Sequence, residues 1–165
     1  MIVCETIPSG HVNIGLTPAP ERCQDNVVEL STLLTADYAN VEQKGKLNVM
    51  GIFGQINSSA FPARHPEMHL VVSLVATPAE AGQTRQLTIR LMDEDGSSIF
   101  EWSKPIEVPA YQVPGSRIEV NAILQLRDMV FEKPGTYEFR VLVDNDDKGY
   151  RPLVVAEAIP APEQG

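Results

Sequence analysis

The sequence predicts an all-β protein, built as an antiparallel two-sheet β-sandwich of about eight strands. Apolar and polar residues alternate in short segments that recur every 10–20 residues or so, roughly the spacing of strands in a sandwich, with turn signals between them. The 165-residue chain contains 13 Pro and 11 Gly, which indicates many turns. No stretch has the apolar period of an amphipathic helix longer than about three turns.

The first predicted hairpin spans residues 28–53. Its first strand alternates, and one face would carry Val28, Leu30, Thr32, Leu34, Ala36 and Tyr38. The chain then reverses through a polar segment that ends at Gly45, a residue suited to turn conformations. The second strand starts at Lys46, and its apolar parity changes at Gly51, which predicts a β-bulge there.

The third and fourth strands are predicted at 68–76 and 85–92. Apolar residues occupy both faces of 68–76, so we expect that strand to be covered on both sides. The polar segment 77–83 joins the two strands as a loop. An Asp-Glu-Asp-Gly reversal at 93–96 leads into a fifth strand, which Pro105 marks as an edge strand or a broken strand.

The last three strands are predicted at 118–126, 135–143 and 150–158. Residues 127–131 either continue the sixth strand or form one turn of helix. The pair Gly135-x-Tyr137 resembles the tyrosine corner of immunoglobulin-like domains, in which a Tyr hydroxyl ties a strand to the preceding loop. We therefore expect a sandwich of the immunoglobulin-like or a related type.

We expect three parts in the chain: an irregular N-terminal extension over 1–27, a β-sandwich domain over 28–158 and a disordered tail over 159–165. Both cysteines, Cys4 and Cys23, lie in the extension, so no disulfide would cross the domain. The sequence shows neither a secretory signal nor an apolar run long enough to span a bilayer. We expect a cytoplasmic protein.

The charge of the chain narrows the choice of partners. The formal charge is −9 at pH 7, and the Lys and Arg residues are scattered singly. An acidic surface repels phosphate backbones and anionic lipid headgroups, so we expect no nucleic-acid partner and no membrane partner. The expected partner is another protein.

Three motifs resemble those of a bacterial domain family of unknown function. The first is an opening hairpin with a Lys-Leu-Asn-x-x-Gly signature, which runs from Lys46 to Gly51 here. The others are Leu87-x-Ile89-x-Leu91-x-Asp93-x-Asp95-Gly96 and Pro134-Gly135-x-Tyr137-x-Phe139-x-Val141. The resemblance covers residues 28–156 and implies a compact β domain without an established activity.

Two clusters contain residue types that bind metals. His65, Glu67 and His69 alternate, so they would point to one side of an extended segment; surface histidines at the start of a strand are the other interpretation. Residues 144–149 imitate the first half of a calcium loop, but Val155 stands where an EF-hand needs Glu, which excludes that motif.

A looser calcium site would combine the two acidic turns, if both lie at one end of the sandwich. Its ligands would be Asp93, Asp95, Asp144 and Asp146. Asp, Asn and Gly are also the usual residues of turns between strands, so the same pattern fits plain turn chemistry.

No catalytic constellation is recognisable, and we expect neither an enzyme nor a cofactor. The sequence has no Gly-x-Ser-x-Gly elbow and no phosphate-binding glycine loop. Glu101 and Glu107 could face a common cleft, but an exposed strand face accounts for them equally well.

Aromatic residues are the remaining candidates for recognition. Phe100 and Trp102 share parity with Ile106, which favours packing in the core. Tyr111 and Tyr150 lie beside loops and are the candidate partner-binding residues, because Tyr is frequent at binding hot spots. We predict a noncatalytic protein-interaction module; the alternative is a calcium- or small-ligand-binding domain that uses the acidic turns. The oligomeric state stays open, and a homodimer through an edge strand is compatible with the sequence.

Overall fold

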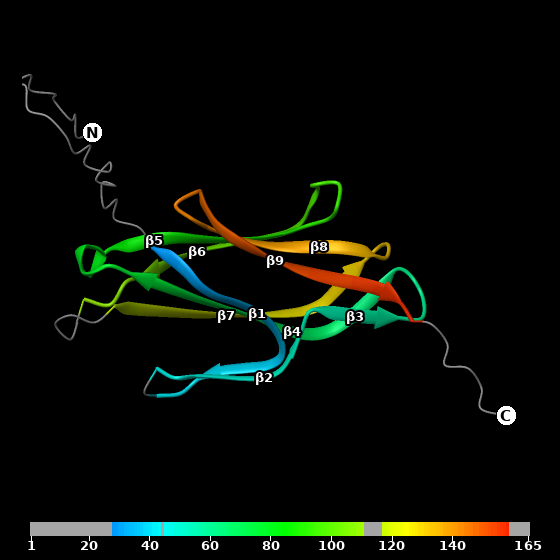
Figure 1. Ribbon diagram of the computed structural model, residues 1–165, viewed down its shortest axis with the longest axis horizontal. Coiled ribbons are helices and arrows are strands. Elements are labelled where there is room, and N and C mark those ends of the chain that lie inside the picture. The colour runs from blue at the N-terminus through cyan, green and yellow to red at the C-terminus, as the bar shows by residue number, and fades with distance from the viewer. Residues whose placement is uncertain (1–27, 44, 111–116, 159–165) are drawn as a thin grey trace, which may run out of the picture.

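The computed structural model describes residues 28–43, 45–110 and 117–158, which form β-strands and one short 3-10 helix (Figure 1). The elements in chain order are β1 (Glu29–Val41), β2 (Leu47–Phe53), β3 (Gln55–Ser58), β4 (Ala63–Ala76), the 3-10 helix η1 (Pro78–Glu80), β5 (Thr84–Met92), β6 (Ser98–Glu107), β7 (Ile118–Phe131), β8 (Gly135–Val143) and β9 (Asp146–Glu157). This described part of the chain contains no helix that is long and apolar enough to cross a membrane.

The strands form two sheets. The first sheet has the order β2-β1-β4-β7, and the second has the order β3-β9-β8-β5-β6. All neighbours are antiparallel except β3 and β9, which are parallel. The predicted all-β class with two sheets is confirmed, whereas a fully antiparallel arrangement of about eight strands is wrong. A ninth strand arises because the segment that starts at Lys46 leaves the first sheet after Phe53 and joins the second sheet as β3.

Gly51 does not form the predicted bulge. The pairing of β1 with β2 keeps one register from Val41 opposite Leu47 to Thr35 opposite Phe53, so no residue is inserted. Gly51 instead has a φ of +66°, and a Cβ on it would overlap Oδ2 of Asp37 and lie 2.8 Å from its Cγ. The position requires glycine because the Asp37 carboxylate rests directly on its backbone.

A register shift occurs instead in β1, between Leu30 and Thr32 where this strand pairs with β4. One extra residue moves every following side chain of β1 to the opposite face. Leu33 therefore belongs to the core, and Tyr38, predicted on the same face as Val28, is 48% exposed on the other side of the sheet. For the residues of β1 that follow the shift, the prediction of which side chains point inward is wrong.

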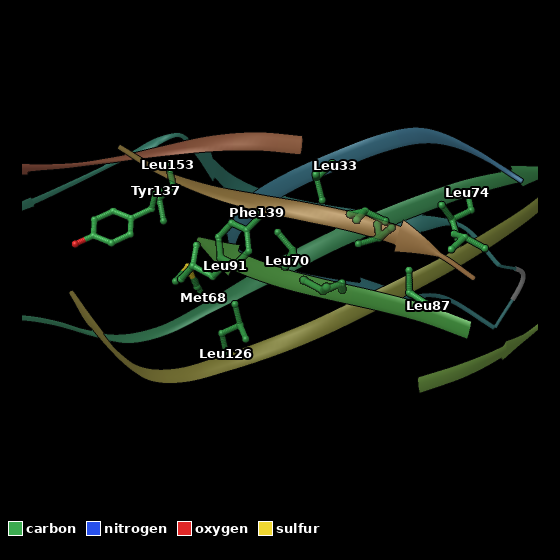
Figure 2. Packing of buried hydrophobic residues seen from close by; sticks show 14 of the residues in the cluster. Leu33, Met68, Leu70, Leu74, Leu87, Leu91, Leu126, Tyr137, Phe139 and Leu153 are labelled. Atoms are coloured by element: carbon green, nitrogen blue, oxygen red, sulfur yellow. The ribbon is translucent and has the colours of Figure 1, made fainter. Parts of the chain in front are cut away.

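One apolar cluster draws its side chains from both sheets, and Figure 2 shows them pointing toward one another. The first sheet contributes Leu33, Met68, Leu70, Leu74 and Leu126, and the second contributes Leu87, Leu91, Tyr137, Phe139 and Leu153, among others. Strand β4 is buried at every position from Met68 to Leu74, so its predicted coverage on both faces is confirmed.

The strand arrangement confirms one further prediction and decides two questions that the sequence leaves open. Strand β6, which contains Pro105, lies at the edge of the second sheet. Phe100 and Trp102 are partly buried against the core. Residues 127–131 continue β7 as a strand.

The loop predicted at 77–83 contains a feature that the sequence does not reveal. Glu80, at the end of η1, is fully buried, and its Oε1 pairs with Arg85 at 3.1 Å. A polar residue type in a loop predicts exposure, and only the tertiary structure places this carboxylate inside.

The tyrosine corner is present. The Tyr137 hydroxyl donates a hydrogen bond of 2.7 Å to the carbonyl of Lys133, four residues upstream. The ring itself is buried and packs edge-on against Phe131, with 4.9 Å between the ring centroids. The hydroxyl thus ties the start of β8 to the turn that follows β7.

We expect Tyr137→Phe to lower the free energy of unfolding by about 0.5–1.5 kcal/mol, because it removes the partly buried hydrogen bond to the Lys133 carbonyl. Urea denaturation measures the change. The matched control is Tyr150→Phe, which removes the same atom from an exposed ring and should change stability by less than about 0.5 kcal/mol. Equal effects of the two variants would contradict the role given to the Tyr137 hydroxyl.

We expect Gly51→Ala to destabilise the fold by about 1–3 kcal/mol more than Gly96→Ala. Both glycines have positive φ, but a Cβ at Gly96 would meet nothing within 4 Å. The difference between the variants therefore measures the contact with Asp37. Adding Asp37→Ala to Gly51→Ala should recover part of the loss in a double-mutant cycle, and an additive result would refute this explanation.

Candidate functional site

The predicted calcium ligands Asp144 and Asp146 belong to a tight hairpin between β8 and β9. Asp144 and Asn145 both have positive φ, 51° and 69°, as a two-residue type I′ turn requires. Asp144 Oδ1 accepts a hydrogen bond of 2.8 Å from the Gln86 backbone N–H, and Oδ2 pairs with Arg85 at 3.1 Å. Asp146 pairs with Lys148 at 2.7 Å. These carboxylates serve the turn and the end of the sheet.

The other predicted ligands, Asp93 and Asp95, lie in the turn between β5 and β6. Asp93 Oδ1 accepts hydrogen bonds from the backbone N–H groups of Asp95 and Ser97, at 3.0 and 2.8 Å. Asp95 pairs with Lys133 at 2.8 Å. The hydrogen bond to Asp95, followed by that to Glu94, raises the pKa of the exposed Lys133 ammonium above its ordinary value.

The two acidic turns lie at opposite ends of the second sheet, so the combined calcium site does not form. Asp144 contacts the residues at the start of β5, whereas Asp93 directly follows the end of that strand. Only Leu87–Met92 of β5 lie between Gln86, which binds Asp144, and Asp93, and this stretch corresponds to roughly 20–25 Å. Within the described residues no three His, Cys, Asp or Glu side chains gather as metal ligands.

The histidine cluster is also dispersed. Glu67 lies 3.3 Å from Arg127 on the neighbouring strand β7. His69 is buried, and its Nδ1 lies 3.0 Å from the carbonyl of Asp37. The His65 ring packs against Phe53, with 5.7 Å between the centroids. Each residue has a separate structural contact, and the prediction of a shared metal is not supported.

A depression of about 360 Å³ lies where β2 passes into β3 and is the place to look for a small ligand. It is lined by Asp37, Gly51, Ile52, Phe53, Gln55, Ile56, Asn57 and His65. Gln55 Nε2 donates to Asn57 Oδ1 at 2.7 Å. The buried Nε2 of His65 has no hydrogen-bond partner among the described residues. A ligand site usually combines several such polar groups with an apolar lining, and this depression offers one.

Of the two predicted partner-binding tyrosines, Tyr111 lies outside the described residues. Tyr150 lies on β9 and is 58% exposed. The Arg140 guanidinium stands 5.5 Å from the centre of its ring and also pairs with Asp147 at 2.9 Å, which raises the pKa of this Arg. On the same face Arg90 pairs with Glu101 at 2.6 Å, so Glu101 does not share a cleft with Glu107. The surface around Tyr150 is thus charged and ion-paired.

Part of the outer face of the first sheet, away from the Glu67–Arg127 pair, has the opposite character. We name it the uncharged face; it consists of Leu34, Ala36 and Tyr38 on β1, Met50 and Ile52 on β2, Val71 on β4 and Ile123 on β7. Residues that pair directly across strands share a face. Tyr38 pairs with Met50, Ala36 with Ile52, and Val71 with both Leu34 and Ile123.

The uncharged face exposes large apolar side chains next to one another. Tyr38 is 48% exposed, Met50 65% and Ile52 56%. The alternation within each strand does not predict this face, because the register shift near Ser31 turns Tyr38 outward and because Gly51 leaves Met50 and Ile52 in one register. Neither effect has a local signal beyond the presence of a glycine.

We expect no rise in melting temperature when calcium is added to about 5 mM, because the acidic turns do not meet. Asp144→Ala should lower the free energy of unfolding by about 1–3 kcal/mol without calcium, since Gln86 and Arg85 lose their acceptor. Asp146→Ala is the control and should cost less than about 1 kcal/mol, as an exposed pair does. A calcium-dependent rise that Asp144→Ala abolishes would reverse this conclusion.

The solved structures to which this chain is similar include parts of larger proteins. One is an alkylpurine DNA glycosylase AlkC from Pseudomonas fluorescens bound to DNA containing an abasic site analog, at 17% identity over 79% of this chain and 31% of that chain, with a TM-score of 0.43. Another is a beta-glucosidase from Listeria innocua, at 10% identity over 80% of this chain and 16% of that chain, with a TM-score of 0.45. This chain thus spans less than a third of the length of either protein.

No curated protein matches the sequence. A family model described as "Family of unknown function (DUF6941)" matches residues 31–156. This range contains most of the described residues, among them the exposed residues of the uncharged face, Tyr38, Met50 and Ile52. On this match, the chain is a member of the DUF6941 family.

Proposed function

We propose that this domain is a noncatalytic protein-interaction module that binds through the uncharged face. The observation that carries the proposal is the exposure of Tyr38, Met50 and Ile52 side by side. Contiguous exposed apolar residues commonly mark interaction sites. Tyr and Met are also enriched in protein interfaces, where Asp, Glu and Lys are depleted.

The scaffold that supports this face is, in our proposal, a β-sandwich of the immunoglobulin-like or a related type, acting in the cytoplasm. Two observations favour the sandwich: the core cluster draws on both sheets, and the Tyr137 hydroxyl forms a tyrosine corner. The absence of cysteine from the described residues fits a reducing compartment.

The choice of the uncharged face over Tyr150 follows from the surroundings of each. Around Tyr150 the charged groups are already paired within the chain, and a partner would have to displace or desolvate them. At Met50 a partner displaces only water from apolar side chains, which is favourable by about 25 cal/mol for each Å² buried.

The catalytic alternative has less support. The buried ionisable groups of the described residues are engaged with partners of their own: Glu80 with Arg85, and His69 with the Asp37 carbonyl. An enzyme site instead brings a nucleophile, a base and an orienting group within reach of one substrate. We therefore assign recognition, rather than chemistry, to this domain.

The test is affinity capture with the tagged full-length chain, compared between the wild type and Met50→Lys. Lys places a charge on the face that would have to be desolvated, and we expect it to reduce capture at least about tenfold, equal to ~1.4 kcal/mol. The matched control is Ile99→Lys, since Ile99 is 43% exposed on β6 of the other sheet.

The partners are identified by mass spectrometry, and an isotope-labelled second copy of the chain is added so that it is counted too. Unchanged capture by Met50→Lys would remove the uncharged face as the site. Loss of capture with Tyr150→Ala instead would move the site to the second sheet.

A further inference from the structure

We propose that the partner of the uncharged face is a second copy of this chain, bound with strand β2 antiparallel to its own copy about a twofold axis. This inference rests on the proposed function, because it names the partner of that same face. The dimer would join the two first sheets into one continuous sheet.

Strand β2 has an edge that lacks the usual protection against pairing with another strand. An edge strand exposes unpaired N–H and C=O groups, and proteins usually protect such edges with charges, Pro or short length. Among the described residues, β6 carries Lys104 and Pro105, β7 carries Arg127 and Asp128, and β3 has only four residues. Strand β2, Leu47–Phe53, contains no charged residue and no Pro.

The charge of the chain selects a second copy as the occupant. A twofold axis sets each residue near the axis against itself or its neighbours, so any charge there meets a like charge. A chain with a formal charge of −9 meets the least self-repulsion where it associates through residues that carry no acidic group, and β2 with the uncharged face consists of such residues. A basic partner would instead favour the acidic surfaces elsewhere on the molecule.

The nearest acidic side chain on the adjacent strand does not oppose this arrangement. Asp37 lies opposite Gly51 in the β1–β2 register, one strand in from the edge. In the dimer it would be three strand spacings from its copy, roughly 14 Å, which exceeds the Debye length of about 8 Å at physiological ionic strength. Salt therefore screens most of the repulsion.

The register follows from the length of the strand. Full pairing of Leu47–Phe53 with its copy centres on Met50, which then lies opposite itself on the axis, and sets Asn48 opposite Ile52. Met50, Ile52 and Tyr38 of both copies lie on one face of the joined sheet. The pairing covers the edge of β2 and sets the exposed Met50 against Met50 of the second copy, which makes the apolar residues of the two copies one continuous patch.

Sedimentation of the full-length chain between about 1 and about 300 µM tests the proposal, because dimerisation responds to concentration by mass action. We expect a mass that approaches twice 18.1 kDa as the concentration rises. Met50→Lys should keep the chain monomeric and Ile99→Lys should leave the dimer intact, with unchanged melting temperatures of the monomers as the check on folding.

The register has a separate test. In a chain with Cys4→Ser and Cys23→Ser, Met50→Cys should form a disulfide-linked dimer under mild oxidation, since facing Cα atoms of about 4.5–5.5 Å separation permit the bond. Ile99→Cys should not. Equal cross-linking of both variants would show random collision and overturn the assigned register.

A wild-type chain that stays monomeric at about 300 µM overturns the dimer. If Met50→Lys still abolishes capture of another protein in that case, the proposed function stands and only the identity of the partner is wrong. A monomer whose β2 amides are protected from hydrogen exchange would show that a segment of the same chain covers the edge, which also overturns the dimer. A dimer that survives Met50→Lys would place the interface elsewhere.

Discussion

The burial of strand β4 on both faces is the constraint on which the rest of this structure depends. Its residues from Met68 to Leu74 are apolar with few exceptions, and all of them are buried. A strand of that composition needs a neighbour on each side and a cover on each face. The neighbours are β1 and β7. The core cluster shared with the second sheet covers the inner face.

The outer face of β4 links the packing of the fold to the proposed interaction surface. Val71 is fully buried, although no second layer of described residues lies on that side. Its neighbours across the strands on that side are Leu34 and Ile123. Burial extends to Ala36 on β1, and the apolar surface continues outward over Tyr38 to Met50 and Ile52, which are exposed. The uncharged face is the uncovered margin of a second, incomplete core.

The parts of the fold that could be predicted from sequence are those in which the local pattern and the tertiary environment agree. Strands β5 and β8 alternate without interruption and were located within a residue of their bounds. The hydroxyl contact of Tyr137 depends on a short-range motif, four residues long, and was also predicted.

The failures have a common physical cause, which is that register is a property of two strands. The extra residue near Ser31 is visible only against β4, yet it decides which face of β1 carries Tyr38. The passage of the chain from β2 to β3 is likewise decided by the free edge of β9 in the other sheet. The candidate interaction surface follows from these two facts, so it could not be predicted from the alternation within either segment.

The acidic turns illustrate how a correct local interpretation can coexist with a wrong functional one. Asp144 occupies a turn, as its residue type indicates. Its carboxylate also holds Arg85, which in turn pairs with the fully buried Glu80. A buried carboxylate is costly without a cation, and that cation is better positioned with a second carboxylate beside it. Asp144, predicted as a calcium ligand, therefore positions Arg85 against the buried carboxylate of Glu80, whose burial the sequence pattern does not reveal.

The outer surface of the second sheet and the uncharged face differ in the charged residues that they carry. Arg90, Arg140 and their carboxylate partners cover the second sheet, where they keep an acidic protein soluble and discourage edge-to-edge contact. A single Lys at Met50 or Ile52 would protect β2 in the same way at almost no cost in stability, because both positions are exposed. The strand nevertheless keeps apolar residues at both positions. Such residues give up favourable burial for as long as they face water, so their placement is best explained by a state in which they are covered.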